Sequence, residues 1–556
     1  MKRNREFATG LGLILCLSTV SAQQDTAPPP EKSGDDQKEQ PAEAAPKQEM
    51  PTLSVGYADW GLRGNSHKFL QYATPARGLF IRQFRYAPSM MDLRHQAVLD
   101  ARAPFEDDYR LTGQGRLNYG GTYAQLSDSR SRFYDPVPLV IDQSQRYITE
   151  GFISHKVTPS LAVSFRGQMD QQDKAFEPPL NSFHQRTRTW NAAIQGTVGQ
   201  KGFVDASYTD LRYWDRTDVL PDTETQRWSL GYSHQVAPNL NLSGSLGHSR
   251  IHQNFGQTNT VNNWSIGGQW NPTDSTMVMA SLQNASMDLP SVDNGYVRRR
   301  GIGKIRVVQR WENWSAQLSF TRNNLERLTD DHLFIETPKW NNWEGSITGR
   351  LTEWLRVTGR FTSQRMENRV TMQTEDPRAL YWTSRSTGQV KLDASSEFLS
   401  GYFIFGGQEN HNGPRNTTIR NQNFTFGATW QARPELELYF ESSTDNWSAS
   451  TPDAAAGTLR GYFPDGTTIT VGGAWALAPN ASLVANYTRF VTNNDNVLGL
   501  RDGNVRGSMF TGTFRYQVRD GLDLSLTYAP WSYTDRVYSP SSYNSGFLSI
   551  SASLKF

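Results

Sequence analysis

Alternation between apolar and polar residues is the feature that most limits what this chain can fold into. In the final segment SGFLSISASLKF (545–556), every second residue is apolar. Side chains on a β-strand point alternately to opposite faces, so this pattern predicts a strand with one apolar and one polar face. The apolar series is Leu548, Ile550, Ala552, Leu554 and Phe556, and the polar series is Ser549, Ser551, Ser553 and Lys555.

Similar alternation recurs in segments of about ten residues, the length a tilted strand needs to cross a hydrocarbon core. Examples are 240–246, 510–518 and 522–528. Beyond residue 53 there is no apolar run long enough for a membrane helix and no long 3.6-residue period. Only 37% of the residues are hydrophobic, whereas 12% are aromatic. This composition favours a membrane barrel with a polar interior and aromatic girdles.

The N-terminus has the features of a secretory signal peptide, which we place at residues 1–22. Three basic residues precede the apolar stretch 11–20, and Val20-Ser21-Ala22 offers a small-residue cleavage site. The only cysteine, Cys16, lies within this segment. The mature chain therefore has no thiol for a disulfide, a cysteine-ligated metal or covalent haem attachment.

Residues 23–52 are rich in Pro, Glu and Gln and nearly devoid of apolar side chains. Such a segment cannot bury enough surface to fold, so we expect a disordered periplasmic leader. Cleavage of the signal removes three basic residues and one acid, which leaves 53 of each sign. This balance argues against a nucleic-acid partner.

Connections between the expected strands fall into two kinds. Long polar segments such as 171–187 and 446–466 alternate with short turns. Outer-membrane barrels have short periplasmic turns and long extracellular loops. The short segments are 157–161, 198–202, 236–240, 271–275, 311–315, 351–355, 432–436, 478–482 and 518–522. Beside them, where an interfacial aromatic girdle would lie, are Trp270, Trp311, Trp314, Trp354, Trp430 and Trp475.

These patterns predict an all-β fold: residues 53–556 form one transmembrane antiparallel β-barrel of about 26 strands, within a range of 22 to 26. The short leader is too polar to fold inside the barrel, so we expect no plug domain. The last residue, Phe556, resembles the signal by which bacterial barrels are recognised for insertion. A soluble propeller is disfavoured because its inner strands would be apolar on both faces.

A search for chemistry assigns no catalytic, cofactor-binding or metal-binding residue, and we expect no enzymatic activity. His248 and His252 are spaced too far apart along a strand end and loop to hold one metal. No G-x-S-x-G motif is present to mark an esterase nucleophile. The acidic pairs Asp107–Asp108 and Asp330–Asp331 are candidates for Ca²⁺ ligands, although solvated loop acids are the more common case.

The opening LSVGYADWGLRGNSHKFLQYATPARGLFIRQFRY (53–86), followed by 109–126, resembles the start of the MtrB/PioB-type porins that sheathe a decahaem cytochrome. Ser66, Lys68, Phe69 and Tyr72 carry the likeness as an S-x-K-F-x-x-Y element. The resemblance implies an outer-membrane conduit that encloses a periplasmic multihaem c-type cytochrome. The partner carries the haem, and the barrel insulates and positions it; whether an outer-surface cytochrome caps the complex stays open.

Inward-pointing polar residues such as Arg515, Gln517 and Arg519 would then face the cytochrome, or simply the water of the lumen. Two other functions remain as alternatives. A diffusion or substrate-specific porin would need 16 or 18 strands and a loop folded inward. A lipopolysaccharide translocon would call for a folded N-terminal periplasmic domain and cysteines, which the expected mature chain lacks.

Overall fold

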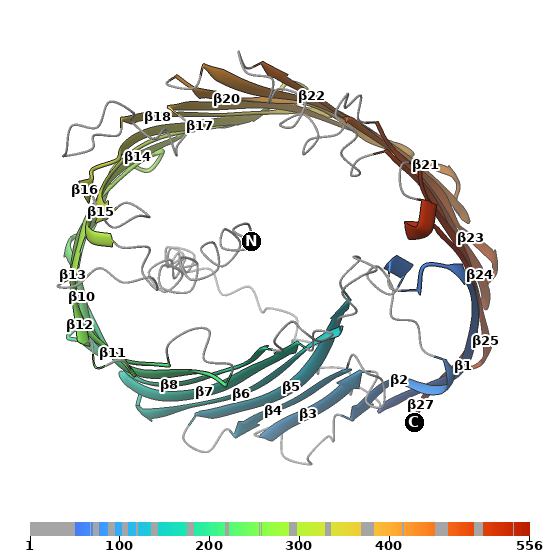
Figure 1. Ribbon diagram of the computed structural model, residues 1–556, viewed down its shortest axis with the longest axis horizontal. Helices are drawn as coiled ribbons and strands as arrows, with labels where there is room; N and C mark the ends of the chain where they lie inside the picture. The colour runs from blue at the N-terminus through green and yellow to red at the C-terminus, as the bar shows by residue number, and fades with distance from the viewer. Residues whose placement is uncertain are drawn as a thin grey trace, which may run out of the picture.

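A computed structural model describes residues 51–556 with internal gaps. One antiparallel sheet contains every strand of the described chain, and it closes into a ring in Figure 1. The predicted signal peptide and most of the predicted leader lie outside the described residues. Those outside are 1–50, 67, 70–76, 87–94, 103–108, 118–120, 135–142, 175–182, 217–221, 255, 257, 288–296, 329–334, 368–382, 414–415, 451–464, 494–503 and 537–538.

The sheet has 27 strands in the described residues. They are β1 (Thr52–Gly64), β2 (Gly78–Tyr86), β3 (His95–Arg102), β4 (Tyr109–Leu117), β5 (Thr122–Tyr134), β6 (Gln143–Thr158), β7 (Leu161–Lys174), β8 (Phe183–Val198), β9 (Gly202–Asp215), β10 (Thr223–Ala237), β11 (Leu240–Gln253), β12 (Thr258–Thr273), β13 (Thr276–Met287), β14 (Val297–Arg310), β15 (Trp314–Leu328), β16 (Ile335–Glu336), β17 (Lys339–Arg350), β18 (Leu355–Glu367), β19 (Ser384–Ser395), β20 (Leu399–Asn412), β21 (Thr417–Arg433), β22 (Leu436–Ser450), β23 (Asp465–Ala478), β24 (Ala481–Asn493), β25 (Val505–Arg519), β26 (Leu522–Asp535) and β27 (Tyr543–Lys555).

Almost every strand pairs with its sequence neighbours, and the ring is closed by the first and last strands. The β1–β27 register runs without interruption from Thr52↔Lys555 to Gly64↔Tyr543. At the rim of this seam, the Phe556 amide donates a hydrogen bond to the Pro51 carbonyl (3.0 Å). Closure removes the free edges of the sheet, which would otherwise expose unpaired backbone groups to lipid.

The predicted strand number, about 26, agrees with the ring, because β16 and β17 lie on the same side of β15 and together form one strand position. The two residues of β16 pair with the end of β15, and β17 continues the same pairing along the rest of that strand. A closed ring in which every neighbour is antiparallel, β1 and β27 included, must contain an even number of strand positions.

All nine predicted short turns connect successive strands, and the predicted long segment 446–466 includes the connection from β22 to β23. Within the described residues, no helix is both long and apolar enough to span a membrane. A 3₁₀ turn, η2 (Ser539–Ser541), lies between β26 and β27.

The two faces of the wall differ in chemistry. We call the outer face the one that carries exposed large apolar side chains, such as Leu246, Ile266 and Ile550, because a bilayer must cover them. The face reached by the alternate residues is the inner face. Near the short turns, five of the six predicted girdle tryptophans are exposed, and Trp314 is half-buried.

Aromatic rings on one strand repeatedly cover glycines on the next. A Cβ at Gly345 would overlap the ring of Phe361, and one at Gly349 would overlap the indole of Trp314. The same arrangement occurs on the inner face, where Tyr402 lies over Gly427. Glycine is required at such positions because only a missing side chain leaves room for the ring, and the ring in turn shields the glycine backbone.

The seam also holds the main buried cluster of the described residues. Phe69, the largest fully buried side chain among the described residues, is 1% exposed; it lies after β1 and packs against Trp60, Trp531 and Tyr543 with ring centroids 5.4–5.7 Å apart. Trp60, Trp531 and Tyr543 belong to β1, β26 and β27. Three strands from opposite ends of the sequence are thus joined by one aromatic core, which we call the seam cluster.

Candidate functional site: the inner face of the barrel

Pairs of hydroxyl groups line the inner face between neighbouring strands. Ser and Thr occupy the inner position of successive strands because the alternation places them opposite one another in register. In each pair one hydroxyl donates a hydrogen bond to the other, so that donor is satisfied without a charged group. The pairs are Ser207–Ser229 (2.7 Å), Ser245–Ser265 (2.7 Å), Thr425–Ser443 (3.2 Å), Thr470–Thr488 (3.1 Å), Thr513–Thr527 (3.1 Å) and Ser525–Ser551 (2.6 Å).

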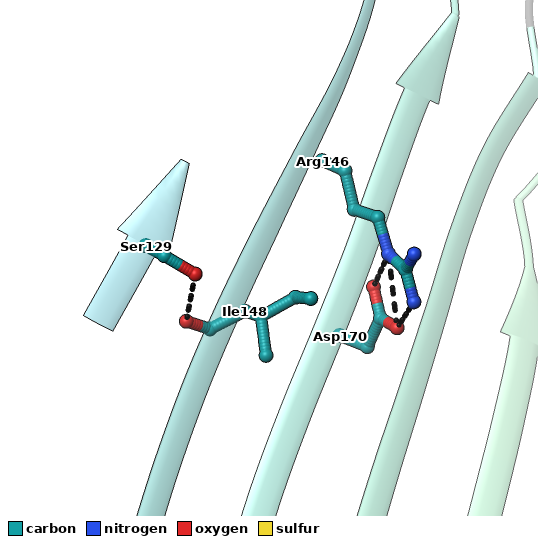
Figure 2. A network of polar contacts seen from close by, with 4 residues as sticks. All are labelled: Ser129, Arg146, Ile148 and Asp170. Atoms are coloured by element: carbon teal, nitrogen blue, oxygen red, sulfur yellow. Dashed lines mark hydrogen bonds and ion pairs between the residues drawn. The ribbon is translucent and has the colours of Figure 1, made fainter. Parts of the chain in front are cut away.

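Between β6 and β7 the inner face is charged rather than neutral. Figure 2 shows the Arg146 guanidinium holding both carboxylate oxygens of Asp170, with a shortest distance of 2.5 Å. A second pair, Arg166 and Glu150, lies on the same two strands at 2.5 Å. Both arginines are about half exposed, so these charges remain accessible from the lumen. A polar surface of this kind suits contact with water or with another polar surface.

A longer polar chain crosses four strands on the other side of the ring. Lys391 on β19 contacts Asp393 at 2.6 Å and lies 5.2 Å from the ring centre of Tyr402 on β20. The Tyr402 hydroxyl donates to the Glu441 carboxylate on β22, and its ring covers Gly427 on β21. These contacts fix the directions of several charged groups on the inner face.

The predicted inward residues of β25 lie near the short-turn end of the strand. Arg515 and Gln517 share one face, opposite Ser525 and Asp523 of β26, and both are exposed. A register shift between Gln517 and Arg519 separates Arg519 from this series. A bulge inserts a residue and re-aims the side chains beyond it, which simple alternation does not anticipate.

The predicted histidines lie on one strand, β11, rather than on a strand end and a loop. His248 Nδ1 is 2.8 Å from Asn262 Oδ1, and His252 Nδ1 is 3.1 Å from Thr258 Oγ1. No group of three metal-ligating side chains occurs among the described residues. The acidic pairs Asp107–Asp108 and Asp330–Asp331 lie outside them.

The motif that carries the family resemblance forms a short capped turn after β1. Asn65 accepts a hydrogen bond from the Lys68 amide (2.8 Å), and its own side-chain amide donates to the Pro540 carbonyl (3.2 Å). Lys68 Nζ lies 5.3 Å from the ring centre of Tyr533, and Phe69 enters the seam cluster. Tyr72 lies outside the described residues.

Sequence reasoning did not identify the structural role of this motif. Asparagine is a preferred helix N-cap, so Asn65 carried a local signal for the turn. Nothing in the sequence, however, indicated that Phe69 meets residues more than 450 positions away.

Comparison with solved structures gives matches to outer-membrane iron receptors. The FrpB iron transporter from Neisseria meningitidis (F3-3 variant) aligns at a TM-score of 0.50 and 9% identity, covering 92% of this chain and 82% of that one. The siderophore receptor PirA from Pseudomonas aeruginosa aligns at a TM-score of 0.44 and 9% identity, covering 92% and 81%. No family model matches the sequence, and a search of curated proteins gives no significant match.

The likeness to FrpB corrects the prediction of a barrel without a plug domain. Outer-membrane transporters of that size have a plug domain in the lumen. The similarity to such a fold therefore contradicts the prediction that the barrel has no plug. The prediction rested on the composition of residues 23–52. Composition describes whether a segment can fold by itself, but it does not determine what occupies the interior of a barrel.

Three observations now converge. The sheet closes on itself through β1 and β27, its outer face is apolar between aromatic levels, and its fold is similar to that of an outer-membrane transporter. Closed barrels with an apolar outer band are the β-structures that can span a bilayer. The protein is a β-barrel of the bacterial outer membrane.

Proposed function

We propose that this barrel sheathes and positions a multihaem c-type cytochrome for electron transfer across the outer membrane. The observation that most supports this function is the number of strands around the closed sheet. Its ring of 26 strand positions exceeds the 22 strands of the plugged outer-membrane transporters, and barrel diameter grows roughly in proportion to strand number. A barrel of this circumference is wide enough to surround a folded partner, which the resemblance of residues 53–86 suggests is a decahaem protein.

The inner face supports the same proposal. Fixed ion pairs and hydroxyl pairs present a polar surface whose side chains are already oriented, so a partner would lose little side-chain entropy on binding. An interface around the inside of a barrel would bury well over the roughly 1,600 Å² of a standard complex. The complex should therefore survive detergent extraction.

Purification from the native host tests this function. A tagged barrel should carry a haem-staining partner through detergent extraction and size exclusion. Liposomes that contain the complex should let an external reductant reduce an enclosed electron acceptor. Liposomes that contain the barrel alone should not transfer electrons. A haem-free native barrel that conducts ions as a stable, defined pore would overturn the proposal and favour a porin.

Solute uptake is the second candidate, and the likeness to the FrpB iron transporter favours it. One growth experiment distinguishes the two functions. Deletion of the gene should impair respiration on, or oxidation of, extracellular electron carriers if the barrel is a conduit. A defect confined to growth under iron limitation would instead assign uptake.

A further inference from the structure

Four arginines gather on the outer face of β8, β9 and β11, at the end of the strands away from the short turns. Arg186 and Arg188 belong to β8, Arg212 to β9 and Arg250 to β11, and all four are exposed. They are close in register, because Arg188 pairs with Arg212 and Arg250 pairs with Gln226 of the intervening β10. We call this group the arginine sector; its strands lie at the lower left of the ring in Figure 1.

The height of the arginine sector matches the edge of a bilayer. Arg188, Arg212 and Arg250 each lie about ten residues from the short-turn end of their strand, at Val198, Gly202 and Leu240. Ten residues of a strand tilted in the membrane rise roughly 25 Å, which is the height of the apolar band of such barrels. The sector therefore lies where hydrocarbon gives way to lipid headgroups.

Aromatic side chains lie on the outer face between the arginines and the short turns. Trp190 lies two residues below Arg188 on the outer face, and the Arg188 guanidinium stacks 4.6 Å from its ring centre. Two residues closer to the short turns, Tyr208 of β9 pairs with Trp228 of β10, and both are exposed. Tryptophan and tyrosine prefer the membrane interface, so these side chains independently mark the headgroup level.

The carboxylates near the sector leave most of its charge available. Arg212 contacts both Asp210 and Glu224 at 3.2 Å. Arg186 Nη2 contacts the Met169 sulfur at 2.7 Å. None of the contacts between described residues pairs Arg186, Arg188 or Arg250 with a carboxylate. Three guanidinium groups thus face the lipid at the level where anionic groups are found.

We propose that the arginine sector binds the phosphate groups of glycolipids in the outer leaflet. The planar guanidinium fork matches a phosphate with two parallel hydrogen bonds, and it loses less hydration on binding than an ammonium group. Outer-membrane barrels place their long loops outside, so the sector faces the outer leaflet. The site holds a lipid beside the wall, apart from the inner face and from the proposed partner there.

A binding titration with defined lipids tests this site. The purified barrel in detergent is titrated with bisphosphorylated lipid A, and the bound lipid is counted by native mass spectrometry. Arg186→Gln combined with Arg188→Gln should weaken binding about 25-fold, because each arginine near an anionic headgroup contributes about fivefold. The difference in affinity between the wild type and the double variant should shrink at high salt. Dephosphorylated lipid A should bind the two proteins with equal affinity.

A matched control comes from the outer face of β21. Arg420 is also exposed, but it contacts Glu409 at 2.7 Å, so Arg420→Gln should change lipid binding less than twofold. Heat-modifiable gel mobility should show all variants folded. Equal affinity in the wild type and the double variant would overturn the proposal. So would displacement of the lipid by millimolar inorganic phosphate, because that result would assign the sector to a soluble anion instead.

Discussion

Two parts of the inner face are built on different principles. At the seam, where β1 meets β27, Phe69 is buried in an aromatic cluster that resembles the core of a soluble domain. Between β6 and β7 the inner face carries half-exposed ion pairs and no buried cluster among the described residues. The β1–β27 pairing is continuous, and the β6–β7 pairing is interrupted only by a register shift between Lys156 and Thr158 beside the turn, so the backbone pairing alone does not explain the difference.

The difference follows from how each contact forms. β6 and β7 are joined by a two-residue turn, so their pairing is local and costs little loop-closure entropy. β1 and β27 stand at opposite ends of the barrel sequence, and bringing them together is the least local step of assembly. We infer that apolar burial is concentrated at the seam because closure needs a stabilising contribution that a hairpin does not.

Removal of the Phe69 ring from the seam cluster should have the largest effect on stability. Phe69→Ala should destabilise the barrel by about 3–5 kcal/mol, the range for deletion of a buried aromatic side chain. The measurement is the urea midpoint of folded gel mobility in detergent. Phe398→Ala is the matched control, because Phe398 lies in a turn and is 60% exposed. Equal midpoints for the two variants would remove the distinction between seam and wall.

A charge on the outer side of the seam tests the assignment of faces. Ile550→Lys should cost about 2–4 kcal/mol, because Ile550 is exposed toward lipid near the middle of β27. Ser549→Lys, one residue away on the inner face, should cost much less. The yield of folded barrel in outer-membrane fractions reports both. A larger loss for Ser549→Lys would reverse the two faces.

The glycine–aromatic contacts give the wall a smaller packing constraint of its own. Gly345→Ala should destabilise by about 1–3 kcal/mol because its Cβ would overlap the Phe361 ring. Gly388 flanks the same phenylalanine on the other neighbouring strand, but a Cβ there meets nothing within 4 Å. Gly388→Ala should therefore change the urea midpoint little, and similar shifts in both variants would show that the overlap does not matter.

The smallest effect is expected from the ion pair on the inner wall. Arg146 is 52% exposed, so solvent screens its pair with Asp170, and Arg146→Ala should cost less than about 1 kcal/mol. A double-mutant cycle with Asp170→Asn isolates the pair itself. A coupling as large as the loss in Phe69→Ala would show that the charged wall is as stabilising as the aromatic seam.

Several structural features were predictable because their causes are local. Alternation in 545–556 assigned Ile550 and Ser551 to opposite faces, and the structure exposes the first and buries the second. Turn composition located the hairpin at 236–240 between β10 and β11. The bulge before Arg519 and the two-residue strand β16 were not predicted, because each breaks a period within too few residues to leave a pattern.

The sequence alone thus determined the strand period, the two faces and the turns, since each depends on residues within one hairpin. Only the tertiary structure decided that Phe69 belongs with Trp531 and Tyr543, and that Arg188, Arg212 and Arg250 share one height on the outer wall. Both groupings depend on the pairing registers of several successive strands and on closure of the ring. No local period encodes that information, because a one-residue change of register would place the same side chains on other faces and at other heights.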